Sequence, residues 1–527
     1  MSKIRTRFAP SPTGYMHIGN FRTALYAYIF ARQNKGDFIL RVEDTDQKRF
    51  VPDAVEKIIK ILEWAGFTCD EGIFSKGDRG STSLPRRQAG LNQNGPKRLN
   101  LFESKNYKRI VEVGDYGPYI QSERLEIYKK YAEELVKSSK AYYCFCSPER
   151  LEKMRAEQTA AKQAPMYDRC CLKLSADEIK KKLENGEKYV IRQKINVEGI
   201  TKFEDIIRGK VKFENKLLDD QVLLKSDGYP TYNFANVIDD HLMEISHIIR
   251  GEEFISSTPK FIQLYDNFGW DKPKFAHLPL LLNTDRTKLS KRQGDVSIED
   301  YIKKGYLKDA IINFVALLGW NPGKGETQEI FTMDELIRKF DLKKVHKGGA
   351  IFDLAKLDWI NAQYIKKLTV DELCELSKEF FEQKDFYLNA AEERKTENYL
   401  KKVLAVEQER LVNLSGVGES HKFFFREPVY EKELLRWKKM SDGDLKIYLE
   451  KAKIILENIS DASWTKENLE KILLKEAGDK RGEFLWPLRV SLTGEQKSPP
   501  PYEVVWVLGE NETLRRIELA LEKMQSS

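Results

Sequence analysis

Two short stretches carry residue types that suit work on a phosphorylated ligand. The first runs from Arg7 to Arg22 and holds two prolines, two glycines and one histidine, His17. Its prolines interrupt a strand, and helical spacing of apolar residues follows, so we expect a strand, a loop and a helix start. N–H groups at a helix start bind phosphate, Gly19 lets a ligand lie against the backbone, and His17 can donate to a phosphate oxygen. Alone, the stretch also fits an ordinary strand-to-helix connection.

The second stretch is Lys-Leu-Ser-Lys-Arg at residues 288–292. Two ammonium groups and a hydroxyl on one loop suit a triphosphate, because positive charge must offset the charge that builds up as pyrophosphate leaves. A lysine-rich pentapeptide on its own is more often a solvated loop. Its place far downstream of a His-x-Gly loop favours the functional interpretation, with Lys288, Ser290 and Lys291 as the candidate phosphate ligands.

Together the two stretches resemble the two signatures of class I aminoacyl-tRNA synthetases. Arg-Phe-Ala-Pro-Ser-Pro-Thr-Gly at 7–14 is similar to the glutamyl and glutaminyl subgroup, and the tail at 486–494 resembles the end of a bacterial glutamyl-tRNA synthetase. The resemblance spans nearly the whole chain except residues 76–108. It implies ligation of L-glutamate to the 3′ end of tRNA(Glu) through a glutamyl-adenylate, with ATP as substrate and Mg²⁺ as counter-ion.

The same resemblance implies roles for individual residues. Arg7 and Arg250 would pair with the side-chain carboxylate of glutamate, and Glu43 would take its α-amino group. The remaining glutamate-binding residues would be Ala9, Ser11, Tyr232 and Asn236. The residues on ATP would be His17, Gly19, Lys288, Ser290 and Lys291, of which His17, Gly19, Lys288 and Lys291 would be catalytic. From the sequence alone, a solvated acid at a strand end is the favoured interpretation of Glu43.

The elements that position these residues alternate between strand and helix. Residues 4–8 and 37–43 read as strands, and residues 53–65 read as an amphipathic helix that Gly66 ends. This order predicts a parallel α/β sheet, in which ligands bind beyond the carboxyl ends of the strands. Tyr232 and Asn236 are four residues apart and so share one face of a predicted helix.

The expected fold class is α/β, and the resemblance supplies its parts. They are a Rossmann-like catalytic domain with an inserted acceptor-binding α/β domain, a helical stem-contact region and an all-α anticodon-binding domain. The expected boundaries are 1–120 and 226–300 for the catalytic domain, 121–225 for the insert, 301–375 for the stem-contact domain and 376–527 for the anticodon-binding domain. Residues 76–108 are rich in Gly, Ser, Asn, Lys and Arg, and we expect a flexible surface insertion there.

Four cysteines raise the question of zinc. Cys144 and Cys146 form a Cys-x-Cys pair, and Cys170 and Cys171 follow. Some members of the family carry zinc here through Cys-x-Cys and a later Cys-x-His, but this chain has no such histidine. Adjacent cysteines rarely both reach one metal, and a fourth ligand is not evident. Unpaired thiols are therefore preferred to a zinc site at Cys144, Cys146 and Cys171, with zinc left open.

Composition narrows the class of protein. The chain has 527 residues, with 41% hydrophobic residues, 32% charged residues and a net charge of +7. No apolar run reaches the ~20 residues of a membrane span, and no leader precedes Ile4. We therefore expect a cytoplasmic monomer with glutamate, ATP and tRNA(Glu) as partners and no membrane contact. The charge alone does not establish a nucleic-acid partner.

Rival functions and the anticodon complete the sequence-based hypotheses. A glutaminyl-tRNA synthetase shares both signatures but carries β-barrels where this chain is helical. A nucleotidyltransferase without tRNA would not need the helical last third, and a non-catalytic tRNA-binding paralogue should have lost one signature. Arg410 lies where family members that discriminate between tRNA(Glu) and tRNA(Gln) place an arginine, although a solvated helix arginine also fits the position.

Overall fold

The computed structural model describes residues 3–51, 53–76, 101–289, 297–323 and 325–525. The chain divides into two compact units. Unit 1 contains Met1–Tyr301 and Ile311–Leu354, and unit 2 contains Ile302–Ala310 and Ala355–Ser527. The five sequence-based domain boundaries stay predictions, since a division into two units does not test them.

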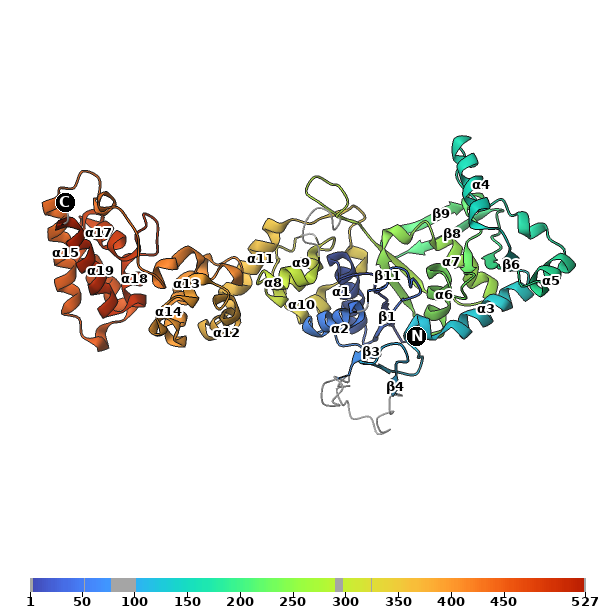
Figure 1. The fold of residues 1–527 in the computed structure, drawn as a ribbon, viewed down its shortest axis with the longest axis horizontal. Helices are drawn as coiled ribbons and strands as arrows, with labels where there is room; N and C mark the ends of the chain where they lie inside the picture. Colours follow the sequence, from blue (N-terminus) through green and yellow to red (C-terminus); the bar gives the residue numbers. More distant parts are fainter. Residues whose placement is uncertain (1–2, 52, 77–100, 290–296, 324, 526–527) are drawn as a thin grey trace. The chain divides into compact units, whose positions relative to one another are not determined.

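The first half of unit 1 is built on a five-stranded sheet with the order β1-β2-β3-β5-β4. Strands β1, β2 and β3 are parallel, and helices α1 and α2 connect them (Figure 1). Strands β5 and β4 extend the sheet in antiparallel fashion. The elements are β1 (Arg5–Phe8), α1 (Ile18–Gln33), β2 (Asp37–Leu40), α2 (Ala54–Trp64), β3 (Glu71–Ser75), β4 (Leu101–Glu103) and β5 (Ile110–Val113). Every residue of β1 and β2 is buried, as expected for parallel strands with helices packed on the sheet.

A second sheet of unit 1 has the order β11-β12-β8-β9. Strands β11 and β12 are parallel, and α7 connects them. The elements are β8 (Ile200–Asp205), β9 (Gly209–Glu214), α6 (Tyr232–Leu242), β11 (His247–Gly251), α7 (Thr258–Phe268) and β12 (Lys274–Leu278). The backbone N–H of Ser246 donates to the carbonyl of Arg5 at 3.0 Å, which brings the start of β11 beside β1. The parallel strands β2 and β3 follow on one side of β1, and β12 follows β11 on the other side. A crevice is therefore expected at the carboxyl ends of β1 and β11, where the strand order reverses.

Residues between the two halves form a smaller α/β part with a three-stranded sheet, β10-β7-β6. Its elements are α3 (Leu125–Lys137), β6 (Ala141–Cys144), α4 (Pro148–Ala160), α5 (Ala176–Glu184), β7 (Val190–Gln193) and β10 (Val222–Leu224). Helix α4 buries none of its residues and stands out from this part in Figure 1. The remaining elements of unit 1 and of its junction with unit 2 are β13 (Leu281–Leu282), α8 (Ile298–Lys303), α9 (Lys308–Leu317), α10 (Met333–Lys339) and β14 (Ala350–Ile351).

Unit 2 is helical throughout its described residues. Besides the first residues of α9, it contains the following α-helices: α11 (Leu354–Lys367), α12 (Val370–Phe381), α13 (Asp385–Leu388), α14 (Glu397–Glu407), α15 (Asp442–Glu457), α16 (Lys466–Ala477), α17 (Arg481–Thr493), α18 (Pro501–Leu508) and α19 (Glu510–Gln525). Helix α17 packs against α15, α16, α18 and α19. The core is formed by fully buried apolar side chains such as Val403, Leu449, Leu473 and Leu488, spaced at helical intervals along their elements.

One sequence-based expectation is wrong in part. Residues 77–100 of the predicted insertion lie outside the described residues, but Leu101–Glu103 form β4 and pair with β5 in the catalytic sheet. A three-residue edge strand is too short to show a period in its sequence, and its backbone hydrogen bonds do not depend on side-chain pattern. Among the described residues, no helix is both long and apolar enough to cross a membrane.

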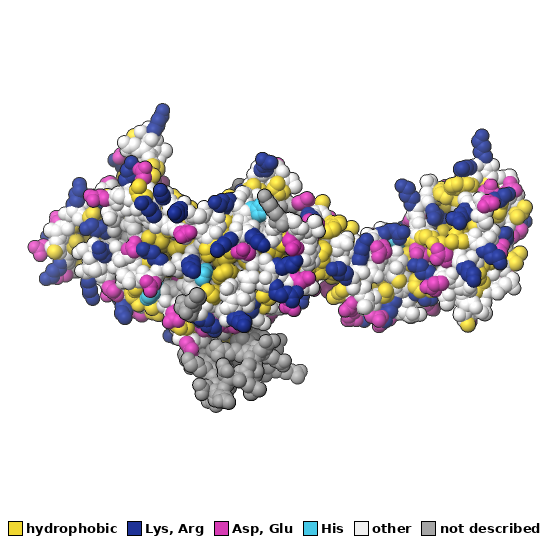
Figure 2. All heavy atoms as spheres, turned by 180° about the vertical axis from the view of Figure 1, so that it is seen from behind, with side chains coloured by type: hydrophobic (Ala, Val, Ile, Leu, Met, Phe, Trp, Pro, Cys, Tyr) yellow, Lys and Arg dark blue, Asp and Glu magenta, His cyan; other side chains and the backbone are white. Residues whose placement is uncertain are grey.

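On the face drawn in Figure 2, charges of both signs are mixed among the described residues. Figure 2 shows lysine and arginine side chains interspersed with aspartate and glutamate on the visible face of each unit. This mixture agrees with the small net charge of +7. Contacts with a polyanion would therefore depend on local groups of cations rather than on the charge of the whole chain.

Candidate active site

A cavity of about 370 Å³ lies at the carboxyl ends of β1 and β11, where the two sheets meet. Its wall combines the loop after β1, the start of α1, the end of β11 and the segment after β12. The predicted site residues that line it are Arg7, Ala9, Ser11, His17, Gly19, Glu43, Tyr232, Arg250 and Lys288. Ser290 and Lys291 lie outside the described residues. The structure thus gathers residues from both ends of a 282-residue stretch into one crevice, since Arg7 and Lys288 both line it.

The start of α1 forms the side of the cavity that suits phosphate. His17 is the N-cap of this helix, and its Nδ1 accepts a hydrogen bond from the N–H of Gly19 at 3.0 Å. In a neutral ring the proton is then on Nε2, which makes Nε2 a donor. A Cβ at Gly19 would lie 3.3 Å from Nδ1 of His17, so a side chain there would crowd the capping contact. The first turn of α1 carries no acidic residue that would repel an anion.

Arg7 is already paired in the floor of the cavity. Its Nε donates to Oδ1 of Asp240 at 3.1 Å, and its Nη2 donates to Oδ2 at 3.3 Å. Asp240 also contacts Nη1 of Arg41 at 2.8 Å, and all three side chains are buried. Burial acts to raise the pKa of Asp240, but the two arginines outweigh it and hold that pKa below its usual value. The charge of Arg7 is therefore largely balanced inside the protein.

Arg250, in contrast to Arg7, has no carboxylate partner among the described residues. It lies on β11, 4% exposed, with the rings of Phe254 and Phe261 within 5.2 Å of its guanidinium carbon. Among the described residues no carboxylate forms an ion pair with it, and its Nη1 has no hydrogen-bond partner. Burial lowers its pKa. An unpaired buried guanidinium nitrogen is costly, and a ligand carboxylate would remove that cost.

Glu43 lines the cavity, where it could bind an amine, and it is buried rather than a solvated acid at a strand end. It is 3% exposed, and its Oε1 accepts from Nη2 of Arg41 at 3.0 Å. Burial raises the pKa of Glu43, with Arg41 opposing the shift. Ser11 fixes the local backbone, since its Oγ donates to the carbonyl of Glu43 at 2.8 Å. A positively charged ligand group beside Glu43 would favour the ionised carboxylate.

Helix α6 contributes its residues differently from the sequence-based expectation. Tyr232 lines the cavity, and burial raises the pKa of its hydroxyl to about 12. Asn236 does not line the cavity; its Nδ2 donates to the carbonyl of Tyr232 at 2.8 Å. The shared helix face was correctly inferred, but the amide is short enough to bond back to the preceding turn. Asp240, one turn further along the same face, was missed, although the spacing 232, 236, 240 is its signal.

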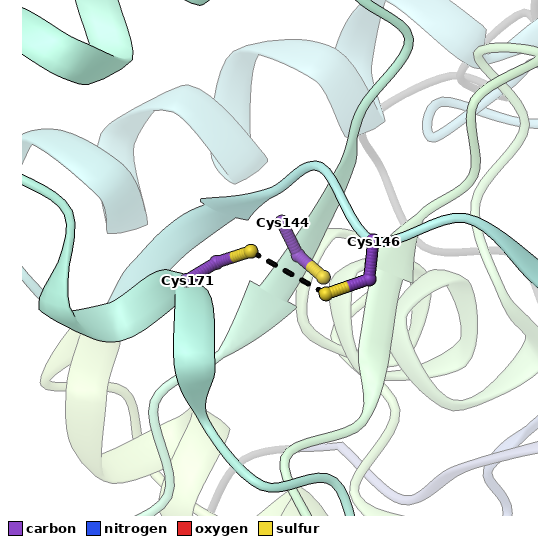
Figure 3. Close-up of side chains that lie close together, drawn as sticks. All are labelled: Cys144, Cys146 and Cys171. Carbon is purple, nitrogen blue, oxygen red and sulfur yellow. Dashed lines mark hydrogen bonds between the residues drawn. The ribbon is translucent and has the colours of Figure 1, made fainter. Parts of the chain in front are cut away.

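The cysteines form a separate cluster in the smaller α/β part of unit 1. The sulfurs of Cys144, Cys146 and Cys171 lie within 4.8 Å of one another, and Figure 3 shows them turned toward a common point. Cys146 Sγ lies 3.5 Å from Cys171 Sγ and 3.3 Å from Cys170 Sγ. The hydroxyl of Tyr167 is 3.3 Å from Cys144 Sγ and 3.4 Å from Cys146 Sγ. The objection that adjacent cysteines do not reach one site is therefore removed by the geometry.

Arg410 lies in unit 2 at the edge of a second cavity of about 240 Å³. Its Nη1 donates to the carbonyl of Val406 at 3.4 Å. The same cavity is lined by Glu407 and His421, which are buried and joined by a 2.7 Å contact, and by Lys497. Cations and hydrogen-bonding groups around a small hollow suit a polar, planar ligand group.

Comparisons with known proteins agree with this geometry. The family model of class I tRNA synthetases (E and Q), catalytic domain, matches residues 3–359, and that of the anticodon binding domain matches residues 369–521. A glutamate–tRNA ligase of Clostridium novyi is 44% identical over 100% of this chain and 99% of its own length. One of Chlorobaculum parvum is 44% identical over 99% of this chain and 98% of its own.

Solved structures give the same result. A glutamate tRNA ligase from Elizabethkingia meningosepticum, determined in complex with its amino acid, superposes with a TM-score of 0.82 at 36% identity and covers 99% of both chains. The glutamate–tRNA synthetase of Elizabethkingia anophelis superposes with a TM-score of 0.80 at 36% identity, over 99% of this chain and 100% of that one.

Proposed function

The chain belongs to the class I tRNA synthetases for glutamate and glutamine, and we propose that it acts as a glutamate–tRNA ligase. It uses ATP to activate L-glutamate as glutamyl-adenylate and then transfers the glutamyl group to the 3′ end of tRNA(Glu). The observation that carries this assignment is the buried guanidinium nitrogen Nη1 of Arg250, which has no hydrogen-bond partner among the described residues and belongs to a residue lining the cavity beside the His17 loop. A side-chain carboxylate fits that nitrogen.

The chemistry needs no nucleophile from the protein. The α-carboxylate of glutamate attacks the α-phosphorus of ATP, and pyrophosphate leaves with the electron pair of the broken P–O bond. A ribose hydroxyl of the tRNA then attacks the acyl carbon, and AMP leaves. The enzyme contributes position and charge stabilisation. Mg²⁺, as the counter-ion of ATP, would offset charge on the phosphates.

Roles follow for the residues around the cavity. His17, Gly19 and Lys288, together with Ser290 and Lys291, hold ATP and stabilise the departing pyrophosphate. On the glutamate side Arg250 binds the side-chain carboxylate and Glu43 the α-amino group. Arg7, Ala9, Ser11 and Tyr232 form the surrounding wall, which is supported by their place in the cavity. Asn236 acts from behind by fixing the turn that carries Tyr232.

Glutamate is the expected amino acid rather than glutamine. The amide of glutamine would present an NH₂ donor or a neutral oxygen to Arg250, and neither balances the guanidinium charge. Past Ile351, moreover, the described residues contain helices and no strand, so the β-barrels of glutaminyl enzymes have no counterpart there. The relatives reported above are likewise named for glutamate.

The cysteine cluster fits zinc in its donor set and its spacing. Tetrahedral zinc with Zn–S bonds of about 2.3 Å places sulfurs about 3.8 Å apart. Cys146, Cys171 and Cys170 have Sγ separations of 3.3–3.8 Å, and Cys144 lies within the same cluster. We therefore propose a structural zinc held by Cys144, Cys146 and Cys171, with Cys170 or Tyr167 at the fourth position. Bound there, zinc would tie β6 to the turn at 170–173 and has no part in the reaction.

Unit 2 supplies the contact with the far end of the tRNA. It contains the segment that matches the anticodon binding domain, and Arg410 lies beside the small cavity described above. We propose that Arg410 reads the anticodon base that distinguishes tRNA(Glu) from tRNA(Gln). We further propose that the protein works as a monomer in the cytoplasm, where tRNA is charged for translation.

ATP–pyrophosphate exchange tests the activation step. The purified protein is given ATP and labelled pyrophosphate with glutamate or with glutamine, each in the presence and in the absence of tRNA(Glu). We expect exchange with glutamate either with or without tRNA(Glu), and no comparable exchange with glutamine under either condition. No exchange with glutamate under either condition would refute the proposed activity.

A further inference from the structure

Three neighbouring strands bring an aspartate, a histidine and an arginine into one row behind the cavity. Strand β12 lies between β11 and β8. Its register sets His277 opposite Arg250 on one side and Phe275 opposite Asp205 on the other. The side chains of Asp205 and His277 are 0% exposed, and Arg250 is 4% exposed. Ionisable groups in such a place persist only when they are hydrogen-bonded to one another.

The hydrogen bonds in this row have one direction. Asp205 Oδ1 accepts from the backbone N–H of Ile207 at 2.9 Å and of Arg208 at 2.8 Å. Its Oδ2 accepts from the backbone N–H of His277 at 3.1 Å and lies 2.6 Å from Nδ1 of the same residue. Because an ionised carboxylate only accepts, the ring proton is on Nδ1, and Nε2 keeps its lone pair.

His277 is therefore an acceptor for Arg250. The Nε–H of Arg250 donates to Nε2 of His277 at 3.2 Å. Burial lowers the pKa of His277, which keeps the ring neutral near pH 7. Burial acts to raise the pKa of Asp205, but His277 and the backbone N–H groups outweigh it and hold that pKa below its usual value. The pair thus stays as carboxylate and neutral imidazole.

These contacts leave one end of the guanidinium for a ligand. Nε of Arg250 is held by His277, and Nη2 donates to Oγ1 of Thr258 at 3.1 Å. The Thr258 hydroxyl itself donates to the carbonyl of Phe254 at 2.9 Å, so its oxygen is oriented to accept. Nη1 alone has no hydrogen-bond partner among the described residues. Two fixed nitrogens determine where the third one lies, since the guanidinium is planar.

We propose that His277, oriented by Asp205, is a positioning residue for glutamate selection: it holds the Arg250 guanidinium so that Nη1 meets the side-chain carboxylate. This inference rests on the proposed role of Arg250 in glutamate binding. His277 is not among the residues that line the cavity, so it acts through Arg250 and not on the substrate. A purely structural His277 would fill the same space without influencing substrate choice.

Three substitutions separate these two roles of His277. His277→Phe keeps a ring of similar size and removes both nitrogens. His277→Asn keeps a donor for Asp205 but cannot reach Arg250, and His277→Gln keeps an acceptor within reach of Arg250. We expect the phenylalanine and asparagine variants to raise the KM for glutamate about tenfold or more, because each loses a hydrogen bond to a buried charge. The glutamine variant should stay within about threefold of the native KM.

Kinetics of the whole enzyme decide the question. Glutamate KM, ATP KM and kcat are measured for each variant, for Arg250→Ala and for the double variant Arg250→Ala, His277→Asn. We expect ATP KM to change less than about twofold, and the asparagine substitution to add less than about twofold to the loss caused by Arg250→Ala. Melting temperatures show whether each variant folds. If either His277→Phe or His277→Asn is unstable, the other one alone is enough to test the loss of the contact with Arg250.

Three outcomes would overturn the proposal. If His277→Phe and His277→Asn leave the glutamate KM unchanged while Arg250→Ala raises it, the role of His277 is refuted and the assignment of Arg250 stands. Losses that multiply in the double variant mean that the two residues act independently, with the same consequence. If Arg250→Ala leaves the glutamate KM unchanged, the proposed binding role of Arg250 fails, and the role of His277 fails with it.

Discussion

At the scale of single residues, the cavity separates two arginines by their surroundings. Arg7 shares the carboxylate of Asp240 with Arg41, so it contributes shape and hydrogen bonding with little uncompensated charge. Arg250 has no such partner among the described residues. The side-chain selectivity of the site therefore depends chiefly on Arg250, and the sequence, which holds both arginines, gives no means of ranking them.

Replacing Arg250 should weaken both catalysis and substrate choice. We expect Arg250→Ala to reduce kcat/KM for glutamate by about 10²-fold or more, because the substrate carboxylate loses its buried partner. The preference for glutamate over glutamine should fall as well, since glutamine never used that charge. Arg49→Ala is the matched control, because Arg49 is exposed and pairs only with nearby Asp46 among the described residues. A full native preference for glutamate in Arg250→Ala would contradict this assignment.

Many of the residues that line the cavity could be predicted from sequence motifs, because the motifs identify segments whose residues bind the same ligand. The two signature stretches and the α6–β11 segment led to eight of its lining residues, and the strand predicted at 37–43 led to a ninth, Glu43. What spacing cannot show is which partner a charged residue finds inside the fold. Asp240 and His277 lie on α6 and β12, and only the packing of these elements reveals that they hold Arg7 and Arg250. Asn236 donates to the carbonyl of Tyr232, and its predicted contact with glutamate stays a prediction.

At the scale of elements, the cysteines join β6 to the short turn at residues 170–173. Residues 170–173 form a single 3₁₀ turn, in which only Cys171 is buried. Spacing along the chain made a site of adjacent cysteines improbable, whereas in the fold the turn brings Cys170 and Cys171 to within 3.8 Å Sγ to Sγ of each other and close to Cys146. The geometry of the turn, which no periodicity encodes, is what creates the site.

Zinc content tests this cluster directly. We expect close to one zinc per chain in the purified protein by elemental analysis, and its loss in Cys144→Ser, because a hydroxyl is a much weaker zinc ligand than a thiolate. Cys374→Ser is the matched control, since Cys374 is a buried free cysteine on α12, well removed in sequence from the cluster. Native protein without zinc would restore the interpretation of these residues as plain thiols, and zinc retained in Cys144→Ser would refute the proposed role of Cys144 as a ligand.

Helix α19 depends on one acidic residue. Glu512 accepts from Nε of Arg516 at 2.6 Å and pairs with Arg394 at 2.7 Å, and Arg516 is fully buried. Burial acts to raise the pKa of Glu512, but Arg515, Arg516 and Arg394 outweigh it and lower that pKa to about 2. A depressed carboxyl pKa stabilises the fold above the unfolded pKa, and the contribution is lost as pH falls through the folded value.

Glu512→Gln should therefore loosen α19 in a pH-dependent way. At pH 7 we expect hydrogen–deuterium exchange of the α19 amides to speed up by about tenfold or more relative to the native chain, since a buried arginine loses its counter-charge. The difference should shrink as pH is lowered from about 4.5 toward 2, where native Glu512 itself becomes neutral. Glu518→Gln, on the same helix in a more exposed pair with Lys453, should have almost no effect. A pH-independent difference would argue against the charge explanation.

At the scale of the whole molecule, the two units carry different parts of the task. Unit 1 contains the cavity and most of the segment that matches the catalytic domain, and unit 2 contains the match to the anticodon binding domain. The face drawn in Figure 2 mixes acidic and basic side chains in each unit. We therefore expect recognition of one tRNA to depend on particular residues in each unit.

Arg410 is the residue on which we place the choice between tRNA(Glu) and tRNA(Gln). Their anticodons differ at the final base, C against G, and an arginine that fits cytosine excludes the larger guanine. We expect the native enzyme to charge tRNA(Glu) in preference to tRNA(Gln), and Arg410→Gln to reduce that preference about tenfold. Arg436→Gln, another surface arginine of unit 2, is the control. Equal charging of both tRNAs by the native enzyme, or an unchanged preference in Arg410→Gln, would contradict the assignment.

The central claim is that this chain attaches glutamate, selected by its side-chain carboxylate, to tRNA. The most direct measurement is the charging of a tRNA(Glu) transcript by the native protein with labelled glutamate or labelled glutamine, with and without ATP. The account predicts glutamate esterified to the 3′-terminal adenosine only when ATP is present, and at least 10²-fold less product with glutamine. Equal charging with glutamine, or no charged tRNA with glutamate and ATP, would contradict it.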